Sequence, residues 1–308
     1  MNILLHILMN NVLPLTVMIA VGMAMEKAFK MDIKTLSKLN FYVFSPAIMF
    51  NLLYRTDIPL KLFGQVMLFV LCFLAAQYAV LEAVVRIRQY DGGMRSAMRN
   101  SVLFYNSANY GIPLNQLAFA GNPYTLSVQI LVMMTQSLIP NTYGVYNVNA
   151  HKAKWKDIRK VILSMPVIYV IPVALALRYF EVSVPGPIET PIGYLADAFI
   201  GTALLTLGVQ LGGMKWRVSR SMAADVGISV FLRLVIGPAL AALVVWALGI
   251  HGMMAAALIV SSAVPTSLSS VLLAVEFDNE SEFASQTVFV STVVSIVSVT
   301  TVIYLLHL

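Results

Sequence analysis

The chain has 308 residues, of which 59% are hydrophobic and 11% are charged, and its formal net charge is +6. Soluble domains average about 45–50% apolar and about 25% charged residues, so this composition excludes a soluble globular fold and indicates an all-α membrane protein. The surplus of lysine and arginine does not indicate a nucleic-acid partner, because membrane proteins concentrate these residues in their cytoplasmic connections.

The hydrophobic residues fall into segments long enough to cross a membrane. Crossing the hydrocarbon core takes about 20 apolar residues, and connections with Pro, Gly, Asn or charge separate such segments here. The first segment lacks the basic start and the small-residue cleavage site of a signal peptide, so we expect it to remain as a span. In chain order the predicted spans are 5–26, 38–54, 62–85, 100–120, 125–147, 161–180, 192–213, 222–249, 252–276 and 284–307.

Basic residues lie almost entirely on one side of these spans. The connections after the first, third, fifth and seventh spans hold four, four, five and three lysines or arginines, whereas the other side holds Arg55, Lys61 and Arg178. The positive-inside rule therefore places the basic side in the cytoplasm and both termini outside. The acidic segment 276–282 also falls on the cytoplasmic side, but acidic residues weigh little in this rule.

A basic connector at residues 148–160 divides the chain into two halves, residues 1–147 and 161–308, with five predicted spans each. Because the number of spans per half is odd, corresponding helices enter the membrane from opposite sides, which is the geometry of an inverted repeat. The sequence therefore predicts ten transmembrane helices arranged as a 5+5 inverted repeat.

The third span carries two residues with reactive side chains. Cys72 is the single cysteine and has no nearby histidine to activate it, so we expect a small buried apolar side chain rather than a nucleophile. Glu82 lies near the cytoplasmic end of the span, where a carboxylate is a candidate for proton coupling.

The fourth span of each half is interrupted near its middle by proline and small polar residues. Proline breaks a helix, and broken backbone at membrane depth is tolerated where protein or a watery cavity covers it. The freed N–H groups at the start of a half-helix can hold an anion. Matched interruptions of this kind indicate a transporter binding site. The candidate residues are Asn106, Asn109, Gly111 and Pro113 in the fourth span, with Ser262, Pro265, Thr266 and Ser267 in the ninth.

The fifth and eighth spans add further polar candidates. Gln129 and Gln136 lie seven residues apart on one helical face, and we favour Gln129 as a site residue. Arg233 lies well inside the eighth span, where it would balance an anionic substrate, snorkel, or pair with Asp225; we favour the ion pair. Other intramembrane prolines are expected only to kink their helices, namely Pro14, Pro46, Pro140, Pro166, Pro172 and Pro238.

The same residues resemble the pattern of the auxin efflux carrier family, which includes plant PIN auxin exporters and bacterial carriers of malonate and related acids. Its fourth span typically has an asparagine followed by Gly-Ile-Pro-Leu, as Asn106 and residues 111–114 have here. Its ninth span has a proline, aliphatic residues and then Ala-x-Glu-aromatic. The matching residues are Pro265, Ala274, Glu276 and Phe277, with further similarity at Pro46, Val128-Gln129-Ile130, Arg233 and Pro238.

This resemblance covers the whole chain and implies a fold like that of sodium/proton antiporters and bile-acid carriers, in which spans 4 and 9 cross as broken helices. Spans 1, 2, 6 and 7 would form a scaffold, and spans 3–5 and 8–10 a core that moves against it as an elevator. A small organic anion would bind beside the crossover, with Asn106 at its carboxylate and Gln129 nearby.

The resemblance further implies a homodimer formed through the scaffold, in the inner membrane of a bacterium. Two departures from the plant members concern substrate and regulation. Ser270 stands where they have a second proline, and their long loop between spans 5 and 6 is absent.

Other functional classes fit the sequence less well. It has no phosphate-binding Gly-Lys-Ser/Thr loop, no HExxH or Cys/His cluster and no Gly-x-Ser-x-Gly motif, which disfavours nucleotide drive, an enzyme and a metal or cofactor site. A charged or carbonyl-rich filter repeat, as in channels, is also missing. A secondary carrier of a small carboxylate is favoured, coupled to H+, to Na+ or to neither. The alternative is a membrane-embedded ligand sensor or interaction subunit.

Overall fold

The computed structural model describes residues 3–55, 60–148, 156, 159, 163–164, 166–214 and 220–308. In these residues the chain is helical, and the isolated β-bridge between Tyr105 and Thr266 joins two short extended linkers. Five helices are individually long and apolar enough to cross a membrane, so the fold is an all-helical, multi-pass membrane protein. They are Leu5–Phe29, Lys61–Ile87, Gly186–Gly213, Ala223–Ala247 and Ser281–Leu305.

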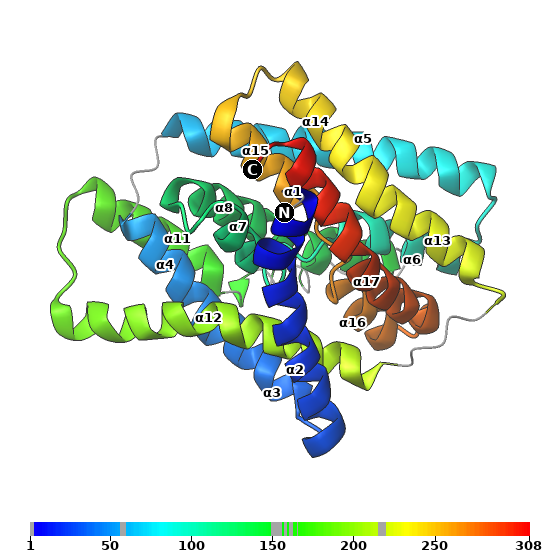
Figure 1. Cartoon of the computed structure of the whole chain (residues 1–308), viewed down its shortest axis with the longest axis horizontal. Coiled ribbons are helices and arrows are strands. Elements are labelled where there is room, and N and C mark those ends of the chain that lie inside the picture. The colour runs from blue at the N-terminus through cyan, green and yellow to red at the C-terminus, as the bar shows by residue number, and fades with distance from the viewer. Residues whose placement is uncertain are drawn as a thin grey trace.

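In the first half, the helices lie where the sequence predicts spans. Elements that abut form one continuous rod, and the label η marks a π-helical stretch within it. In chain order they are α1 (Ile3–Ile7), η1 (Leu8–Val12) and α2 (Leu13–Phe29); α3 (Ile33–Leu39), η2 (Asn40–Phe44) and α4 (Ser45–Arg55); α5 (Leu60–Ile87); α6 (Gly92–Leu103) and α7 (Gly111–Ala118); and α8 (Pro123–Ile139), η3 (Pro140–Gly144) and α9 (Val145–Val148) (Figure 1).

The second half continues in the same way. Most of the predicted connector 148–160 and the first residues of the sixth predicted span lie outside the described residues. The elements are α11 (Pro166–Tyr179); α12 (Gly186–Gly213); α13 (Ala223–Phe231), η4 (Leu232–Ile236) and α14 (Gly237–Ala247); α15 (Gly252–Ser262) and α16 (Ser269–Glu276); and α17 (Ser281–Leu305).

Four of the prolines that were expected to kink helices adjoin π-helical stretches. Pro14, Pro46 and Pro238 each follow the end of such a stretch by two residues, and Pro140 begins one. Proline has no N–H to donate to a carbonyl of the preceding turn. In a π turn, a carbonyl accepts from the N–H five residues later instead of four, which changes the partners of the neighbouring carbonyls. The stretch η4 is important for the site because it contains Arg233.

The helices pack as two groups (Figure 1). In the first group, α12 packs along α2, α3 and α4, and α11 packs on α4. In the second, α5 packs on α6, α8 and α14, while α15 packs on α8 and α14, and α17 on α13 and α16. The two groups meet along α4 with α8, along α12 with α7, and where the N-terminal rod packs through α1 and η1 on α17 and through η1 on α7.

Glycines allow the backbones of α2 and α12 to lie in contact. A Cβ atom added at Gly208 would lie 2.8 Å from the Cα atom of Gly22 and would also meet the carbonyl of Ile19. Small residues at such contacts are the usual basis of helix packing in membranes, where lipid competes with any apolar surface. The close approach therefore fixes the first group of helices as a unit.

We predict that Gly208→Ala lowers the melting temperature, because the added methyl group forces α2 and α12 apart at a cost of about 1–3 kcal/mol. Gly193→Ala is the matched control on the same helix, since a Cβ atom there meets no atom within 4 Å. Thermal denaturation of the purified variants followed by size-exclusion chromatography measures both. Equal melting temperatures for the two variants would contradict the packing account.

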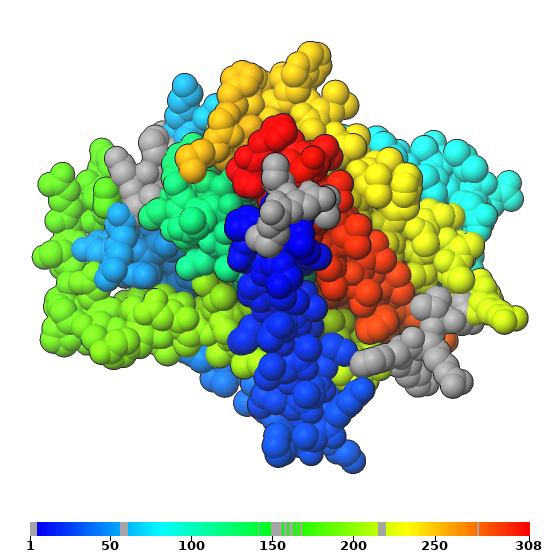
Figure 2. All heavy atoms as spheres, viewed as in Figure 1, coloured from blue at the N-terminus to red at the C-terminus, as the bar shows by residue number. Residues whose placement is uncertain are grey.

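The two chain ends lie beside each other. Figure 2 shows the N-terminal helix in blue crossing one face of the molecule next to the C-terminal helix in red. The elements α1 and η1 pack on α17, and Ile7 and Ile303 belong to one buried apolar cluster. Both termini therefore lie at the same face of the helical assembly.

Candidate functional site

The two proline-interrupted segments are broken helices whose linkers pair with each other. Helix α6 ends at Leu103 before α7 begins at Gly111, and α15 ends at Ser262 before α16 begins at Ser269. The backbone N–H of Asn106 donates to the Pro265 carbonyl at 2.8 Å. The N–H of Ser267 donates to the Phe104 carbonyl, also at 2.8 Å. This exchange satisfies backbone groups that would be costly to bury unpaired.

Thr266 holds the paired linkers to the surrounding helices. Its hydroxyl donates to the Ser101 carbonyl at 2.9 Å, and its backbone N–H donates to the Ser291 hydroxyl at 3.2 Å. Both contacts are buried. Thr266 therefore stabilises the crossover through its hydroxyl and N–H groups, and Pro265 stabilises it through its carbonyl.

Gln129 and the first residues of α7 pack against the linker between α6 and α7. Gln129 donates from its amide to the Ser107 carbonyl at 2.8 Å. A Cβ atom at Gly111 would lie 2.5 Å from that amide nitrogen, so glycine makes room for it. Pro113 lies in the first turn of α7, where a helix has no carbonyl partner for the N–H that proline lacks.

A small polar cavity of about 60 Å³ opens between the paired linkers and the first helix group. It is large enough for a few water molecules or a compact solute. Of the residues expected at the site, Asn106, Asn109 and Ser267 line it, whereas Gly111, Pro113, Gln129, Ser262, Pro265, Thr266, Glu82 and Arg233 do not. The other lining residues are Ser37, Phe41, Tyr105, Ser107, Ala108, Gln136, Ser137, Gln210, Leu268, Ser269 and Leu272.

The cavity offers hydrogen-bond donors without partners. The side-chain oxygen of Asn106 accepts from the Asn109 backbone N–H at 3.1 Å, and its amide nitrogen makes no hydrogen bond in the described part of the chain. Gln136 accepts from the Tyr105 N–H at 3.4 Å, and its buried amide nitrogen has no partner there either. A buried donor without a partner, such as the Gln136 amide, is costly unless a ligand satisfies it, and the Asn106 amide offers a second donor at the same cavity.

The start of α16 and the linker that leads into α7 also reach this cavity. The linker 105–109 leads into α7, and Ser267, Leu268 and Ser269 lead into α16. The start of a helix carries a partial positive charge of about half an elementary unit. With the amides of Asn106 and Gln136, the two helix starts favour a ligand that is negatively charged and rich in acceptor oxygens.

Arg233 and Ser262 contact each other away from the lining of this cavity. Arg233 is fully buried, and its guanidinium donates to the carbonyls of Val102 and Ser262 and to the Gln77 side chain. The Ser262 hydroxyl donates to the Ile259 carbonyl at 2.6 Å. Ser262 therefore contributes its carbonyl to Arg233.

The predicted ion pair between Arg233 and Asp225 is wrong. Asp225 pairs with Arg88 at 3.0 Å and accepts from the Tyr90 hydroxyl at 2.6 Å. Burial raises the pKa of the Tyr90 phenol, and its hydrogen bond to Asp225 adds to this rise, so Tyr90 remains a donor. Eight residues of helix separate Asp225 from Arg233 by about 12 Å along the axis, whereas Arg88 reaches Asp225 from the neighbouring helix end.

Glu82 forms part of a charged cluster away from the cavity. Its carboxylate pairs with Arg99 at 2.6 Å and with Arg86 at 3.5 Å. The side chains of Glu82 and Arg99 are each 16% exposed, so the pair is largely withdrawn from solvent. This arrangement ties α5 to α6.

We predict that Glu82→Gln destabilises the protein by about 1–3 kcal/mol, because Arg99 loses the negative charge that compensates its burial. Any pH dependence of transport should stay as in the wild type. Melting temperature and transport rate measured across pH 5–9 test this, with Glu189→Gln as the control at an exposed ion pair with Arg55. Loss of pH dependence in Glu82→Gln alone would instead assign the carboxylate to proton coupling.

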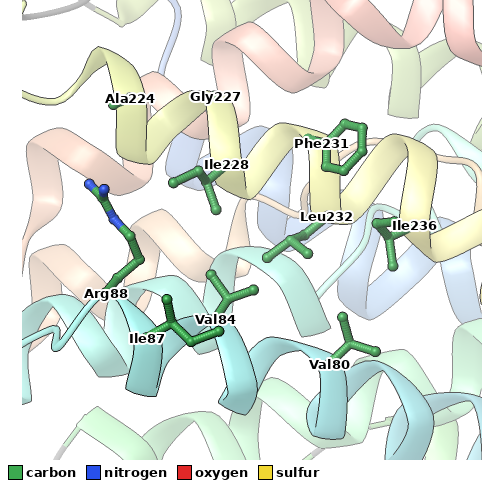
Figure 3. A pocket seen from close by; sticks show the side chains of 10 residues that line it. All are labelled: Val80, Val84, Ile87, Arg88, Ala224, Gly227, Ile228, Phe231, Leu232 and Ile236. Atoms are coloured by element: carbon green, nitrogen blue, oxygen red, sulfur yellow. The ribbon is translucent and has the colours of Figure 1, made fainter.

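A larger cavity of about 620 Å³ lies elsewhere, between α5 and the α13–η4 rod. Figure 3 shows its walls, which are formed by aliphatic side chains and Phe231, with Arg88, the residue directly after α5, at one end. Arg88 is already paired with Asp225. Because this groove offers an anion no free buried donor among its described lining residues, the polar cavity at the crossover is the candidate site.

Comparison with known proteins places the chain among transporters. Residues 154–304 match the model of a family described as membrane transport protein. An uncharacterized transporter of Methanothermobacter thermautotrophicus is 23% identical over 269 residues, which cover 87% of each chain. The family match covers the second half, which includes the ninth-span motif, and the relative extends across most of the first. The second half of the chain therefore matches a family of membrane transport proteins that is the one of the auxin efflux carriers.

Proposed function

We propose that the protein is a secondary carrier for a small organic anion, which binds at the paired helix breaks and crosses the membrane by alternating access. The observation that carries this proposal is that the linker into α7, the start of α16 and the unpartnered amides of Asn106 and Gln136 meet at one cavity. A carboxylate supplies the negative charge and acceptor oxygens that these groups lack. Mono- and dicarboxylates of auxin-like or smaller size are the proposed substrates.

The proposed topology has ten spans in a 5+5 inverted repeat, with both termini outside and the basic connections inside. It is supported by the contacts between connections. Tyr54 donates to the Val182 carbonyl and Arg55 pairs with Glu189, which joins two connections assigned to the outside. Arg88 pairs with Asp225, which joins the connection after the third span to the start of the eighth span, both assigned to the inside.

The acidic segment 276–282 fits the same topology. Asn279 donates to the Gly93 carbonyl at 3.3 Å and to the Ser96 hydroxyl at 2.8 Å. The segment therefore lies against the start of α6. Arg88 precedes this helix start, and Arg95 lies in its first turn. These contacts place the acidic connection beside a basic one, as the topology requires.

The proposed motion is that of an elevator. The cavity lies at the seam between the two helix groups, with Ser37, Phe41 and Gln210 on the first group and the paired linkers on the second. The glycine contact between α2 and α12 stiffens the first group as a scaffold, which we also propose as the surface of a homodimer. Sliding of the second group would carry the cavity from one side of the cell membrane to the other, and in a bacterium this is the inner membrane.

Counterflow in proteoliposomes tests the proposal. Liposomes loaded with an unlabelled carboxylate are diluted into the same compound in labelled form, across a panel of mono- and dicarboxylates. A carrier takes up label transiently against its gradient for at least one member of the panel. Saturable binding of a carboxylate without counterflow would identify a ligand sensor or interaction subunit instead. Neutral solutes of matched size are the control and should not exchange.

A further inference from the structure

The charge of Arg233 lies in a buried place without a counter-ion. Its side chain is fully buried, and no carboxylate of the described residues lies within 4.0 Å of its guanidinium. A charged side chain at membrane depth is expensive and usually functional. The question is therefore which groups compensate this charge.

The guanidinium bridges the ends of the two long half-helices. It donates to the Val102 carbonyl in the last turn of α6 at 3.1 Å, and to the carbonyl of Ser262, the last residue of α15. The end of a helix carries a partial negative charge of about half an elementary unit, so two ends together offset about one positive charge. Arg233 thus stabilises two helix ends that would otherwise be left with free carbonyls.

The surroundings are shaped to hold the guanidinium there. Gln77 accepts from it at 3.3 Å, and the ring of Tyr105 lies with its centroid 4.6 Å from the guanidinium carbon. A Cβ atom at Gly237 would lie 2.9 Å from the guanidinium, so glycine leaves the space that this group fills. Tyr105 also lines the polar cavity, so one side chain separates the positive charge from the cavity.

We propose that Arg233 is the built-in cation of the crossover, and that it takes the place of a dissolved coupling ion. This inference rests on the proposed anion carrier. The carbonyls of Val102 and Ser262 and the Gln77 side-chain oxygen are the kind of ligands a hard cation such as Na+ needs. The guanidinium already uses all three, so anion transport proceeds without Na+. Arg233 is a positioning residue, since it acts on the anion through Tyr105 and the half-helices.

The first test varies the cation around the wild-type protein. Counterflow of a carried carboxylate is measured at constant pH and ionic strength in Na+, K+ or choline medium. The expected rates agree within about twofold, because the positive charge is supplied by the protein. Carboxylate counterflow that disappears without Na+ would overturn this inference and leave the carrier proposal standing. A wild-type protein that exchanges no carboxylate in any medium would overturn both.

The second test changes the charge itself. Arg233→Gln should reduce counterflow by about tenfold to a hundredfold, the range expected for losing charge-assisted hydrogen bonds. Arg233→Lys keeps the charge and should recover part of the rate. Arg233→Ala should regain transport when millimolar guanidinium ion is added, which a merely structural role does not predict. Arg86→Gln, at a side chain that is 77% exposed, is the control and should transport normally.

Size-exclusion chromatography establishes that each variant is folded. A folded Arg233→Gln protein with the wild-type rate would overturn the inference. If Arg233→Gln and Arg233→Ala do not fold, the inference is tested by wild-type counterflow in Na+, K+ and choline media and by the counterflow rate of Arg233→Lys. A folded Arg233→Lys variant that is inactive, and is not improved by any cation, would also contradict the charge-based role.

Discussion

Replacement of Asn106 by alanine is expected to abolish carboxylate transport while the protein still folds. The substitution removes the amide donor at the cavity and the hydrogen bond that Asn106 accepts from the Asn109 N–H. A hydrogen bond to a charged ligand contributes about 1.5–3 kcal/mol, which corresponds to a loss of roughly 10–150-fold in affinity. Thermal-shift titration with a carried carboxylate measures the affinity, and counterflow measures transport.

Asn106→Asp separates the two roles of this side chain. Aspartate has the same shape and keeps an oxygen that accepts from the Asn109 N–H, but it replaces the donor by a negative charge. We expect the linker to stay intact and carboxylate binding to be lost, because like charges now meet at the cavity. Asn115→Ala is the matched control, since Asn115 is buried in α7 but does not line the cavity. Normal carboxylate affinity in Asn106→Asp would remove Asn106 from the site.

Cross-linking the two helix groups across the cavity is expected to stop transport reversibly. Cys72 is the single cysteine, so a Cys72→Ala background allows Ser37→Cys and Ser269→Cys to be labelled as a pair. Both residues line the cavity, one from each group. A cleavable dithiol-reactive linker should abolish counterflow, and reduction should restore it, because the elevator motion requires the groups to slide.

A second cysteine pair within one group controls for damage by the linker. Asn122 and Met253 lie 4.0 Å apart between their side-chain nitrogen and sulfur atoms, and both belong to the second helix group. Linking Asn122→Cys to Met253→Cys should leave transport unchanged. Full activity of the linked Ser37–Ser269 pair would mean that the groups do not move against each other.

The location of the site could be predicted from local sequence because helix breaking is a local property. Pro265 and its polar neighbours interrupt a run of apolar residues, and a break at membrane depth must be covered by another buried segment. Asn106 and Ser267 were found in this way, and both line the cavity. The expectation that the two breaks occur in corresponding spans follows from the same pattern.

The residues that complete the cavity could not be predicted, because they come from distant parts of the chain. Ser37 and Gln210 are ordinary polar residues of helices in the other group, and only the packing of the two groups brings them to the linkers. Gln136 did carry a signal, since it lies seven residues after Gln129. The two glutamines share a helical face, so the choice between them depends on how far along its axis α8 meets the linkers, which places Gln136 at the cavity and Gln129 at the Ser107 carbonyl.

The hydrogen-bond partners of Arg233 could not be predicted from the sequence for a related reason. Spacing along one helix suggested Asp225, but the compensating groups are backbone carbonyls at the ends of two other helices. Every residue has a backbone carbonyl, so the sequence cannot show which carbonyls bind an arginine. An arginine that caps broken helices therefore looks the same in the sequence as an unpaired one. The pairing became visible only when α6, α15 and η4 were seen together.

The most direct measurement of the central claim is a diffraction or electron-microscopy map of the protein with a brominated carboxylate, such as 3-bromopropanoate. The compound is first shown by counterflow to be carried, so that its position reports a transported ligand. We predict density for it between Asn106, Gln136 and Leu268, with its carboxylate toward the starts of α7 and α16. Density in the apolar groove between α5 and α13, with the crossover cavity empty, would contradict the account.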